Sequence, residues 1–234
     1  GINDAGMMPF TIMQLLEGKH GETIKQLICR LDLGINDLRV KQIPAPAIPV
    51  PDSIPEEKRQ ALMTLLGSEQ EFMSVHTLHT QYDNTGIPAG EEEFDLSSHE
   101  SEGTQKLLAL SGPLIDTLQN GKTLIIDELD ARLHPLMTRE IISLFNQKVT
   151  NPHGAQLVFN TQDTNLLDNT LFRRDQIWFV EKDQQGASHL YSLAEFRVRN
   201  DKDYKRGYIQ GRYGAIPYLN HIQTVVSGKH GEKA

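Results

Sequence analysis

Two adjacent carboxylates, Asp127 and Glu128, directly follow a short apolar run at 123–126. Such a run is typical of a buried strand, and open α/β sheets bind their ligands beyond the carboxyl ends of the strands. Phosphoryl-transfer enzymes use this arrangement, because one carboxylate holds Mg²⁺ while its neighbour orients the attacking water and accepts its proton. The same two acids can also cap the following helix, so the pair alone does not distinguish a catalytic role from a structural one.

A phosphate-binding loop of the form G-x-x-x-x-G-K-[ST] does not occur in these residues. The nearest candidate is Gly121-Lys122-Thr123, but the position five residues before Gly121 is Asp116 and not glycine. This segment leads from an expected helix into an expected strand, whereas a phosphate-binding loop leads from a strand into a helix. We therefore interpret Gly121 as part of a tight turn before the strand.

Other residues with chemical potential lack a matching arrangement. His76 and His79 are three positions apart in an expected strand, so they point to opposite faces and do not suit one metal ion. The acidic run 91–102 lacks the spacing of a calcium-binding loop. Cys29 lies on the apolar side of an expected helix and is interpreted as a core residue, and Trp178 is expected to pack against a sheet.

Composition excludes several classes of protein. The 31 acidic and 23 basic residues give a net charge of −8, which provides no general attraction for DNA or an anionic membrane. No apolar stretch approaches the ~20 residues of a membrane-spanning helix. The single cysteine excludes a disulfide framework and a cysteine-rich zinc site. We expect a cytoplasmic protein without membrane contact, whose basic last quarter either meets phosphate or forms a solvated face.

Strands and helices alternate from residue 104 onward, which favours an α/β fold with a partly parallel sheet flanked by helices. Helical spacing of apolar residues predicts helices at 22–31, 56–66, 104–118 and from Pro135 onward. Apolar or alternating runs predict strands at 35–43, 71–82, 91–96, 123–126, 155–159, 176–180 and 188–193. Gly112 and Pro113 are expected to kink or restart the helix 104–118, because proline lacks the N–H that a helix uses.

A proline-rich stretch at 44–55 is expected to be a stiff, extended connector. It divides the chain into a helical N-terminal segment, 1–43, and a larger lobe, 56–234. The larger lobe contains the two carboxylates and most of the expected strands.

Three stretches resemble, in this order, the motifs of ABC-type ATPase heads. SEGTQKLLAL (101–110) resembles the signature motif, LIIDELDARLHP (124–135) the Walker B strand with its D-loop, and LVFNTQDTNLLD (157–168) the switch-histidine loop. The sequence is most similar to the AAA-type, ABC-like ATPases of bacterial abortive-infection and other anti-phage systems, which are relatives of the OLD, RecF and SMC ATPase heads. LDLGINDLRV (31–40) and DYKRGYIQGRYGAIP (203–217) extend the resemblance over most of the chain.

The resemblance implies a P-loop NTPase lobe at 56–234, with 1–43 as a helical insertion segment. Asp127 would help to hold Mg²⁺, and Glu128 would be the catalytic base or would orient the water. The switch position, usually His in these heads, is Gln162 here. Glutamine can hydrogen-bond phosphate or water but cannot change its protonation near pH 7, which implies slow hydrolysis or a site that senses ATP.

The resemblance also implies a dimer. Ser101 and Gly103 would contact the γ-phosphate of ATP bound by the other subunit, since a hydroxyl and backbone N–H groups at a helix start suit an anion. The alternative for Ser101 is a plain N-cap, with Thr104 as a rival cap. Asp130 would lie in the D-loop and communicate across the dimer interface.

The resulting prediction is an ATP-binding and ATP-hydrolysing subunit that uses ATP and Mg²⁺ as a head-to-tail homodimer. In phage defence it would control an effector nuclease or toxin on a separate chain. Because the phosphate-binding loop is missing, we expect the C-terminal part of a longer ATPase, inactive by itself. One alternative is a DNA-repair ATPase of the SMC or RecF kind, which predicts salt-sensitive DNA binding. Another is a non-hydrolysing scaffold, which predicts that Glu128→Gln changes nothing.

Overall fold

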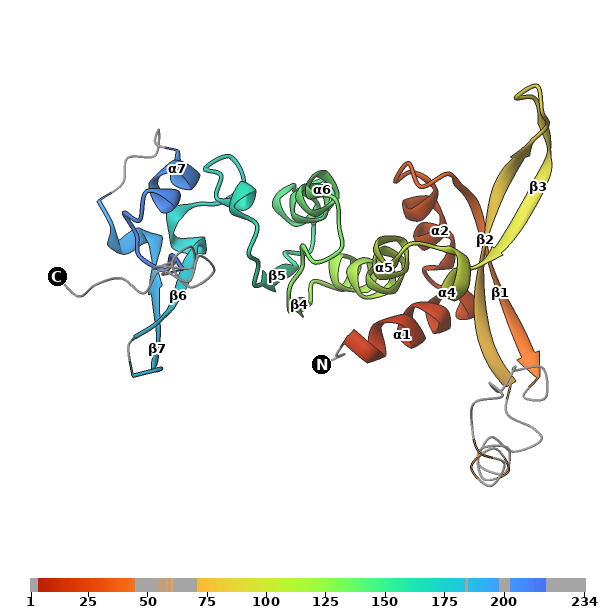
Figure 1. Ribbon diagram of the computed structural model, residues 1–234, viewed down its shortest axis with the longest axis horizontal. Coiled ribbons are helices and arrows are strands. Elements are labelled where there is room, and N and C mark those ends of the chain that lie inside the picture. Colours follow the sequence, from red (N-terminus) through yellow and green to blue (C-terminus); the bar gives the residue numbers. More distant parts are fainter. Residues whose placement is uncertain are drawn as a thin grey trace, which may run out of the picture. The chain divides into compact units, whose positions relative to one another are not determined.

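The computed structural model describes residues 4–44, 71–183, 185–197 and 203–217, together with the single residues 55, 58 and 60. Nearly all of the proline-rich stretch 44–55 and of the helix expected at 56–66 therefore lies outside the described residues. The chain forms two compact units, Gly1–Gln162 and Asp163–Ala234. In Figure 1 the first unit runs from red through green to teal, and the described part of the second runs from teal to blue. The division at the proline-rich stretch stays a prediction.

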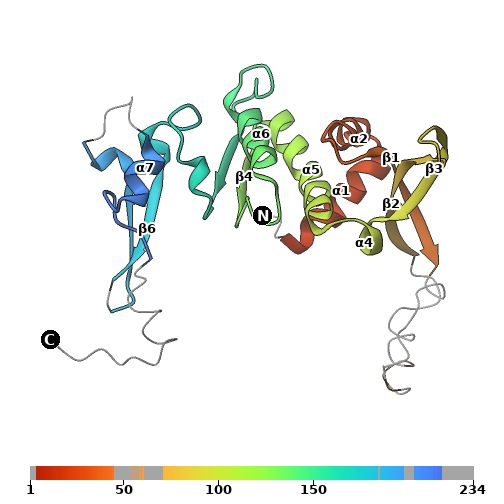
Figure 2. The ribbon, with the colours of Figure 1, turned by 45° about the horizontal axis from the view of Figure 1, so that its top comes forward.

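The first unit begins with two helices, α1 (Asp4–Glu17) and α2 (Gly21–Cys29). Both helices contact the long helix α5 (Glu102–Asn120), beside which they lie in Figures 1 and 2. The helix predicted from Glu22 is confirmed as α2, whereas α1 was not predicted. Cys29 is only partly buried and its thiol donates to the carbonyl of Asn36, so the prediction of a core residue was wrong.

An antiparallel sheet follows, with strand order β1 (Ile35–Pro44), β2 (Glu71–Tyr82) and β3 (Pro88–Asp95). Residues 38, 77 and 94 are aligned across the three strands. The side chains of Leu38 and Thr77 are almost completely buried, so this row forms the centre of the sheet's inner face. The short helix α4 (Leu96–His99) then connects β3 to α5. The three predicted strands are confirmed, and β3 begins a few residues earlier than expected.

Helix α5 is continuous through Pro113, so the predicted restart of this helix was wrong. Proline has no N–H for the carbonyl four residues earlier, which belongs to Ala109. The buried hydroxyl of Thr11 in α1 donates to that carbonyl at 2.8 Å, and the same oxygen accepts from the backbone N–H of Gly112 at 3.1 Å. A side chain from another helix thus supplies the missing donor. Among the described residues, none of the helices combines the length and the apolar character that a membrane span requires.

Two short strands, β4 (Thr123–Ile126) and β5 (Gln156–Phe159), pair in parallel, which confirms the predicted parallel pairing. Gly121 ends α5 in the left-handed conformation, with φ of +61°, and forms the tight turn predicted before β4. Helix α6 (Pro135–Asn146) begins with Pro135 at a first-turn position, as expected, and contacts β5. The first unit is therefore a mixed α/β arrangement in which β4 and β5 leave the loops after them at one edge.

The second unit contains the antiparallel hairpin β6 (Trp178–Lys182) and β7 (Ser188–Ser192), as predicted. Short 3-10 helices at Thr164–Leu166, Arg174–Gln176 and Leu193–Glu195 and the helix α7 (Tyr204–Ile209) complete the unit. Phe179 lies in an aromatic cluster on the covered face of the hairpin, stacked with Tyr208 at a centroid distance of 5.6 Å. Trp178, on the other face, is 55% exposed, so the expectation that it packs the sheet was wrong.

Candidate functional site

The carboxyl ends of β4 and β5 lie together, because their register pairs Ile126 with Phe159. The residues that follow are Asp127 and Asn160, and Nδ2 of Asn160 donates to Oδ1 of Asp127 at 2.5 Å. Oδ1 of Asn160 accepts from the backbone N–H of Glu128 at 2.6 Å. One amide side chain therefore holds both acidic residues at the edge of the parallel pair. Asp127 and Glu128 are exposed, so their carboxylates can reach a ligand.

The backbone at Glu128 has a φ of +48°, in the left-handed region. This conformation is uncommon for residues other than glycine, and such backbone strain gathers at functional sites. Nζ of Lys106 in α5 donates to the carbonyl oxygens of Glu128 at 2.7 Å and Ala131 at 2.9 Å. Lys106 and Asn160 thus hold the strained residue from two different elements.

The start of α5 packs against the loop that follows Glu128. A Cβ atom added to Gly103 would lie 2.6 Å from the carbonyl oxygen of Arg132, closer than atoms can approach. Nε of Arg132 also pairs with Oε2 of Glu102 at 3.2 Å. Ser101 is the N-cap of α5, since its Oγ accepts from the backbone N–H of Thr104 at 3.1 Å. The signature-like segment and the D-loop-like segment of the chain are therefore direct neighbours.

The loop between Glu128 and α6 contains a buried carboxylate oxygen. Leu129 is fully buried, while Oδ1 of Asp130 is buried and has no hydrogen-bond partner among the described residues. Most buried polar atoms in folded proteins are paired, and each exception requires an explanation. Asp130 is thus an acceptor whose donor is not found in the described part of this chain.

Gln162 lies two residues after Asn160, with an exposed side chain, at the end of the first unit. It takes no part in the hydrogen bonds that join Asp127, Glu128 and Asn160. Asn160 itself was missed by the sequence analysis. A usable signal was present: Asn160 is the first polar residue after β5, and parallel strands end at the same edge of a sheet.

The two histidines of β2 have different carboxylate partners. Nδ1 of His76 lies 3.1 Å from a carboxylate oxygen of Glu93, and Nε2 of His79 lies 2.7 Å from Oε1 of Glu100. Within the described ranges, no group of three or more His, Cys, Asp or Glu residues is arranged to hold a metal ion. A metal at Asp127 would therefore need further ligands from outside the described residues, such as water or a bound nucleotide.

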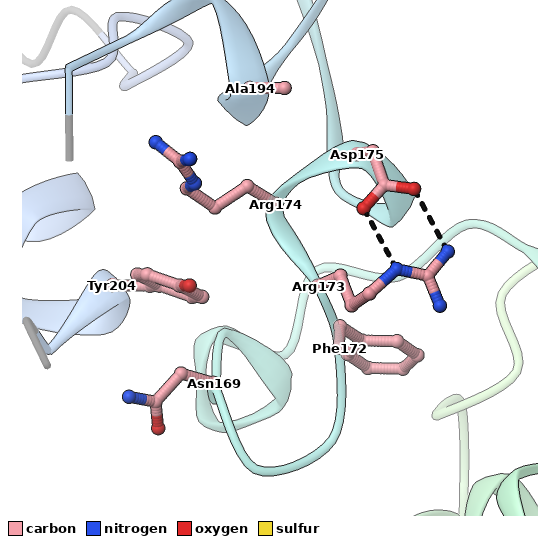
Figure 3. Close-up of a pocket in the computed structure, with 7 residues that line it drawn as sticks. All are labelled: Asn169, Phe172, Arg173, Arg174, Asp175, Ala194 and Tyr204. Atoms are coloured by element: carbon pink, nitrogen blue, oxygen red, sulfur yellow. Dashed lines mark hydrogen bonds and ion pairs between the residues drawn. The ribbon is translucent and has the colours of Figure 1, made fainter. Parts of the chain in front are cut away.

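The second unit contains a cavity of about 360 Å³ between the segment 169–175 and residues Ala194 and Tyr204. Figure 3 shows Arg174 and Tyr204 on one side of it and an ion pair between Arg173 and Asp175 on the other. The hydrogen bond from Arg173 lowers the pKa of the Asp175 carboxyl below its usual value. All lining residues belong to the second unit, whereas the predicted metal ligand Asp127 and catalytic Glu128 belong to the first.

Residues 65–168 match the protein family described as "AAA domain, putative AbiEii toxin, Type IV TA system". This range includes Ser101, Asp127, Glu128 and Gln162, and the match confirms the resemblance seen in the sequence. None of the curated proteins matches the chain. A similar solved structure comes from work on "ATP-driven dimerization and DNA stimulated activation of SMC ATPases"; it is 13% identical, with 87% of this chain and 96% of that chain covered and a TM-score of 0.47.

Proposed function

We propose that the AAA-type, ABC-like domain of this chain hydrolyses ATP at the carboxyl edge of β4 and β5. The observation that carries the proposal is the joint placement of Asp127 and Glu128 by Asn160, inside the range that matches the AAA family. Phosphoryl transfer depends mainly on positioning and electrostatics, so two fixed, exposed carboxylates at a sheet edge suit it.

The donor set fits Mg²⁺ bound together with a nucleotide. Mg²⁺ is commonly held by one or two carboxylates plus phosphate oxygens and waters, and a dedicated protein cage is not required. Asp127 would be the ligand, directly or through water, because its carboxylate is exposed and Asn160 fixes its orientation. The ion would supply charge neutralisation on the phosphate oxygens.

Glu128 would orient the attacking water and accept its proton. Its left-handed backbone directs the residue away from the regular path of β4, and Lys106 and Asn160 keep it there. Gln162 would hydrogen-bond the γ-phosphate or the water from the loop after β5. Because glutamine does not titrate, Gln162 would contribute orientation without a change of charge.

The phosphate cradle would come from a polypeptide segment outside these residues, since the sequence has no phosphate-binding loop. An exposed sheet face supports this proposal. Ile125 of β4 and Val158 of β5 are register partners, yet they are 69% and 53% exposed. Parallel strands are normally covered on both faces, so this apolar face fits a helix that packs on it next to the nucleotide.

ATP would lie between two copies of the head arranged head to tail. Ser101 and Gly103 would then approach the γ-phosphate held by the partner, where the start of α5 offers a hydroxyl and backbone N–H groups. The unpaired buried oxygen of Asp130 supports an interface role, because a donor from the partner subunit would satisfy it. Control of a separate nuclease or toxin, and a role in phage defence, belong to the same proposal.

The test is ATP hydrolysis by the chain joined to its phosphate-binding segment, compared with two variants. Glu128→Gln should reduce kcat by at least about 100-fold while ATP still binds and stabilises the dimer. Glu140→Gln makes the same chemical change at an exposed position of α6 and should leave kcat unchanged. Equal turnover by wild type and Glu128→Gln would contradict the proposal and favour the scaffold.

A further inference from the structure

Glu100 connects the antiparallel sheet to the start of α5. It directly precedes Ser101, and its side chain is only 11% exposed. Its Oε1 accepts from the hydroxyl of Thr77 at 2.6 Å and lies 2.7 Å from Nε2 of His79. Thr77 is fully buried, and both partners are on β2. A carboxylate next to the predicted phosphate-contacting serine is thus attached to a strand of the sheet.

The two contacts explain how a nearly buried carboxylate is tolerated. Burial of a charge is unfavourable unless hydrogen bonds replace the lost water, and hydrogen bonds to a carboxylate are stronger than neutral ones. Thr77 and His79 are two positions apart and therefore lie on the same face of β2. The ring of His79 is also packed against that of Phe94 in β3, at a centroid distance of 5.1 Å. The strand consequently holds Glu100 at two points with little freedom.

The backbone around Glu100 is held as well. Nε2 of Gln105 donates to the carbonyl of Glu100 at 3.0 Å, from within α5. Asp95 caps α4 on the other side and accepts from the hydroxyl of Ser74 at 2.6 Å. Residues 95–105 are therefore fixed to β2 at one end and to α5 at the other.

We propose that Glu100, held by Thr77 and His79, is a positioning residue that sets where the Ser101 hydroxyl meets the γ-phosphate. The inference rests on the proposed function, in which Ser101 acts on the ATP of the partner subunit. It adds that the antiparallel sheet, and β2 in particular, controls the geometry of the ATP site. A shift of β2 would be transmitted to Ser101 through a single buried carboxylate.

The test compares four variants in the chain joined to its phosphate-binding segment. Glu100→Ala and Thr77→Val remove the contact, Thr77→Ser keeps the hydroxyl, and Glu92→Ala removes an exposed carboxylate opposite His79 without touching Glu100. A displacement of about 1 Å costs up to about 100-fold in rate, so the first two variants should lower kcat by between about 10-fold and 100-fold. Their KM for ATP should change by less than about threefold, and Thr77→Ser and Glu92→Ala should resemble wild type.

A second readout separates positioning from simple stabilisation. The backbone amide of Thr104 donates to Oγ of Ser101, so its hydrogen exchange reports whether that cap is in place. Exchange at Thr104 should accelerate in Glu100→Ala and Thr77→Val but not in the other two variants. Variants that only unfold at lower temperature, with wild-type kcat and Thr104 exchange, would overturn the inference. A wild-type protein without ATPase activity would instead refute the proposed function, and Thr104 exchange would still test the link between Glu100 and Ser101.

Discussion

Replacing Thr11 by valine tests whether one hydroxyl keeps α5 continuous at Pro113. Valine has nearly the same shape as threonine, so the change removes the hydrogen bonds without creating a cavity. In the wild type the Thr11 hydroxyl donates to the carbonyl of Ala109 and accepts from the N–H of Gly112. Thr11 is fully buried, so water cannot easily replace the lost group.

The size of the effect follows from these two contacts. A buried polar group that loses its partner costs about 1–3 kcal/mol, and Pro113 has no N–H to offer the Ala109 carbonyl. Adding a smaller loss at the N–H of Gly112, we expect Thr11→Val to lower the free energy of unfolding by about 2–4 kcal/mol. Thr11→Ser keeps the hydroxyl and should lose less than about 1.5 kcal/mol, mainly from one methyl group.

The assay is urea unfolding of a double-mutant cycle with Pro113→Ala. Alanine at this position restores a backbone N–H for the Ala109 carbonyl, so Thr11→Val should cost at least about 1 kcal/mol less in that background. Two results would refute the reasoning. One is a Thr11→Val protein within about 0.5 kcal/mol of wild type, and the other is an equal loss in both backgrounds.

Three further predictions concern the site and its supports. Lys106→Met removes the donor to the Glu128 and Ala131 carbonyls, so kcat for ATP should fall at least about 10-fold, measured by phosphate release. Gly103→Ala places a Cβ 2.6 Å from the carbonyl of Arg132, so the free energy of unfolding in urea should fall by about 1–3 kcal/mol despite the better helix propensity of alanine. Burial opposes ionisation of Asp95, but hydrogen bonds from serine hydroxyls and backbone amides outweigh it and hold the pKa of its carboxyl well below the usual value. The stabilisation by Asp95 is therefore complete above a pH of about 4 and declines as the pH falls further. The melting temperature of the wild type should accordingly fall more between about pH 5 and pH 2 than that of Asp95→Asn.

Matched controls make these outcomes decisive. Lys148→Met changes an exposed lysine and should leave kcat unaltered. Unchanged turnover in Lys106→Met would show that Glu128 keeps its conformation without this lysine. A stable Gly103→Ala protein would mean that the D-loop-like segment moves freely away from α5. An equal change of melting temperature with pH in wild type and Asp95→Asn would contradict the assignment of Asp95 as a stabilising carboxylate.

The sequence alone determined the elements that have a local signal. Apolar spacing located α2, β1, β2 and the parallel strands, and the position of Asp127 and Glu128 after an apolar run marked the edge at which Asn160 holds them. These features depend on residues that are close in the chain, so a period or a turn signal is sufficient to find them. The order of the three resembling motifs also identified the family that residues 65–168 match.

Tertiary structure decided what depends on residues far apart in the chain. Thr11 acts on a carbonyl 98 positions away, which no local rule for Pro113 includes. Asn160 reaches the residues that it orients only because β4 and β5 pair in parallel, and Glu100 reaches Thr77 only because β2 lies beside the start of α5. The contacts of Thr11 and Glu100 satisfy polar groups that burial would otherwise leave unpaired, whereas those of Asn160 join exposed groups. Spacing along the chain therefore reveals which groups are present, while the packing of distant segments decides which of them meet.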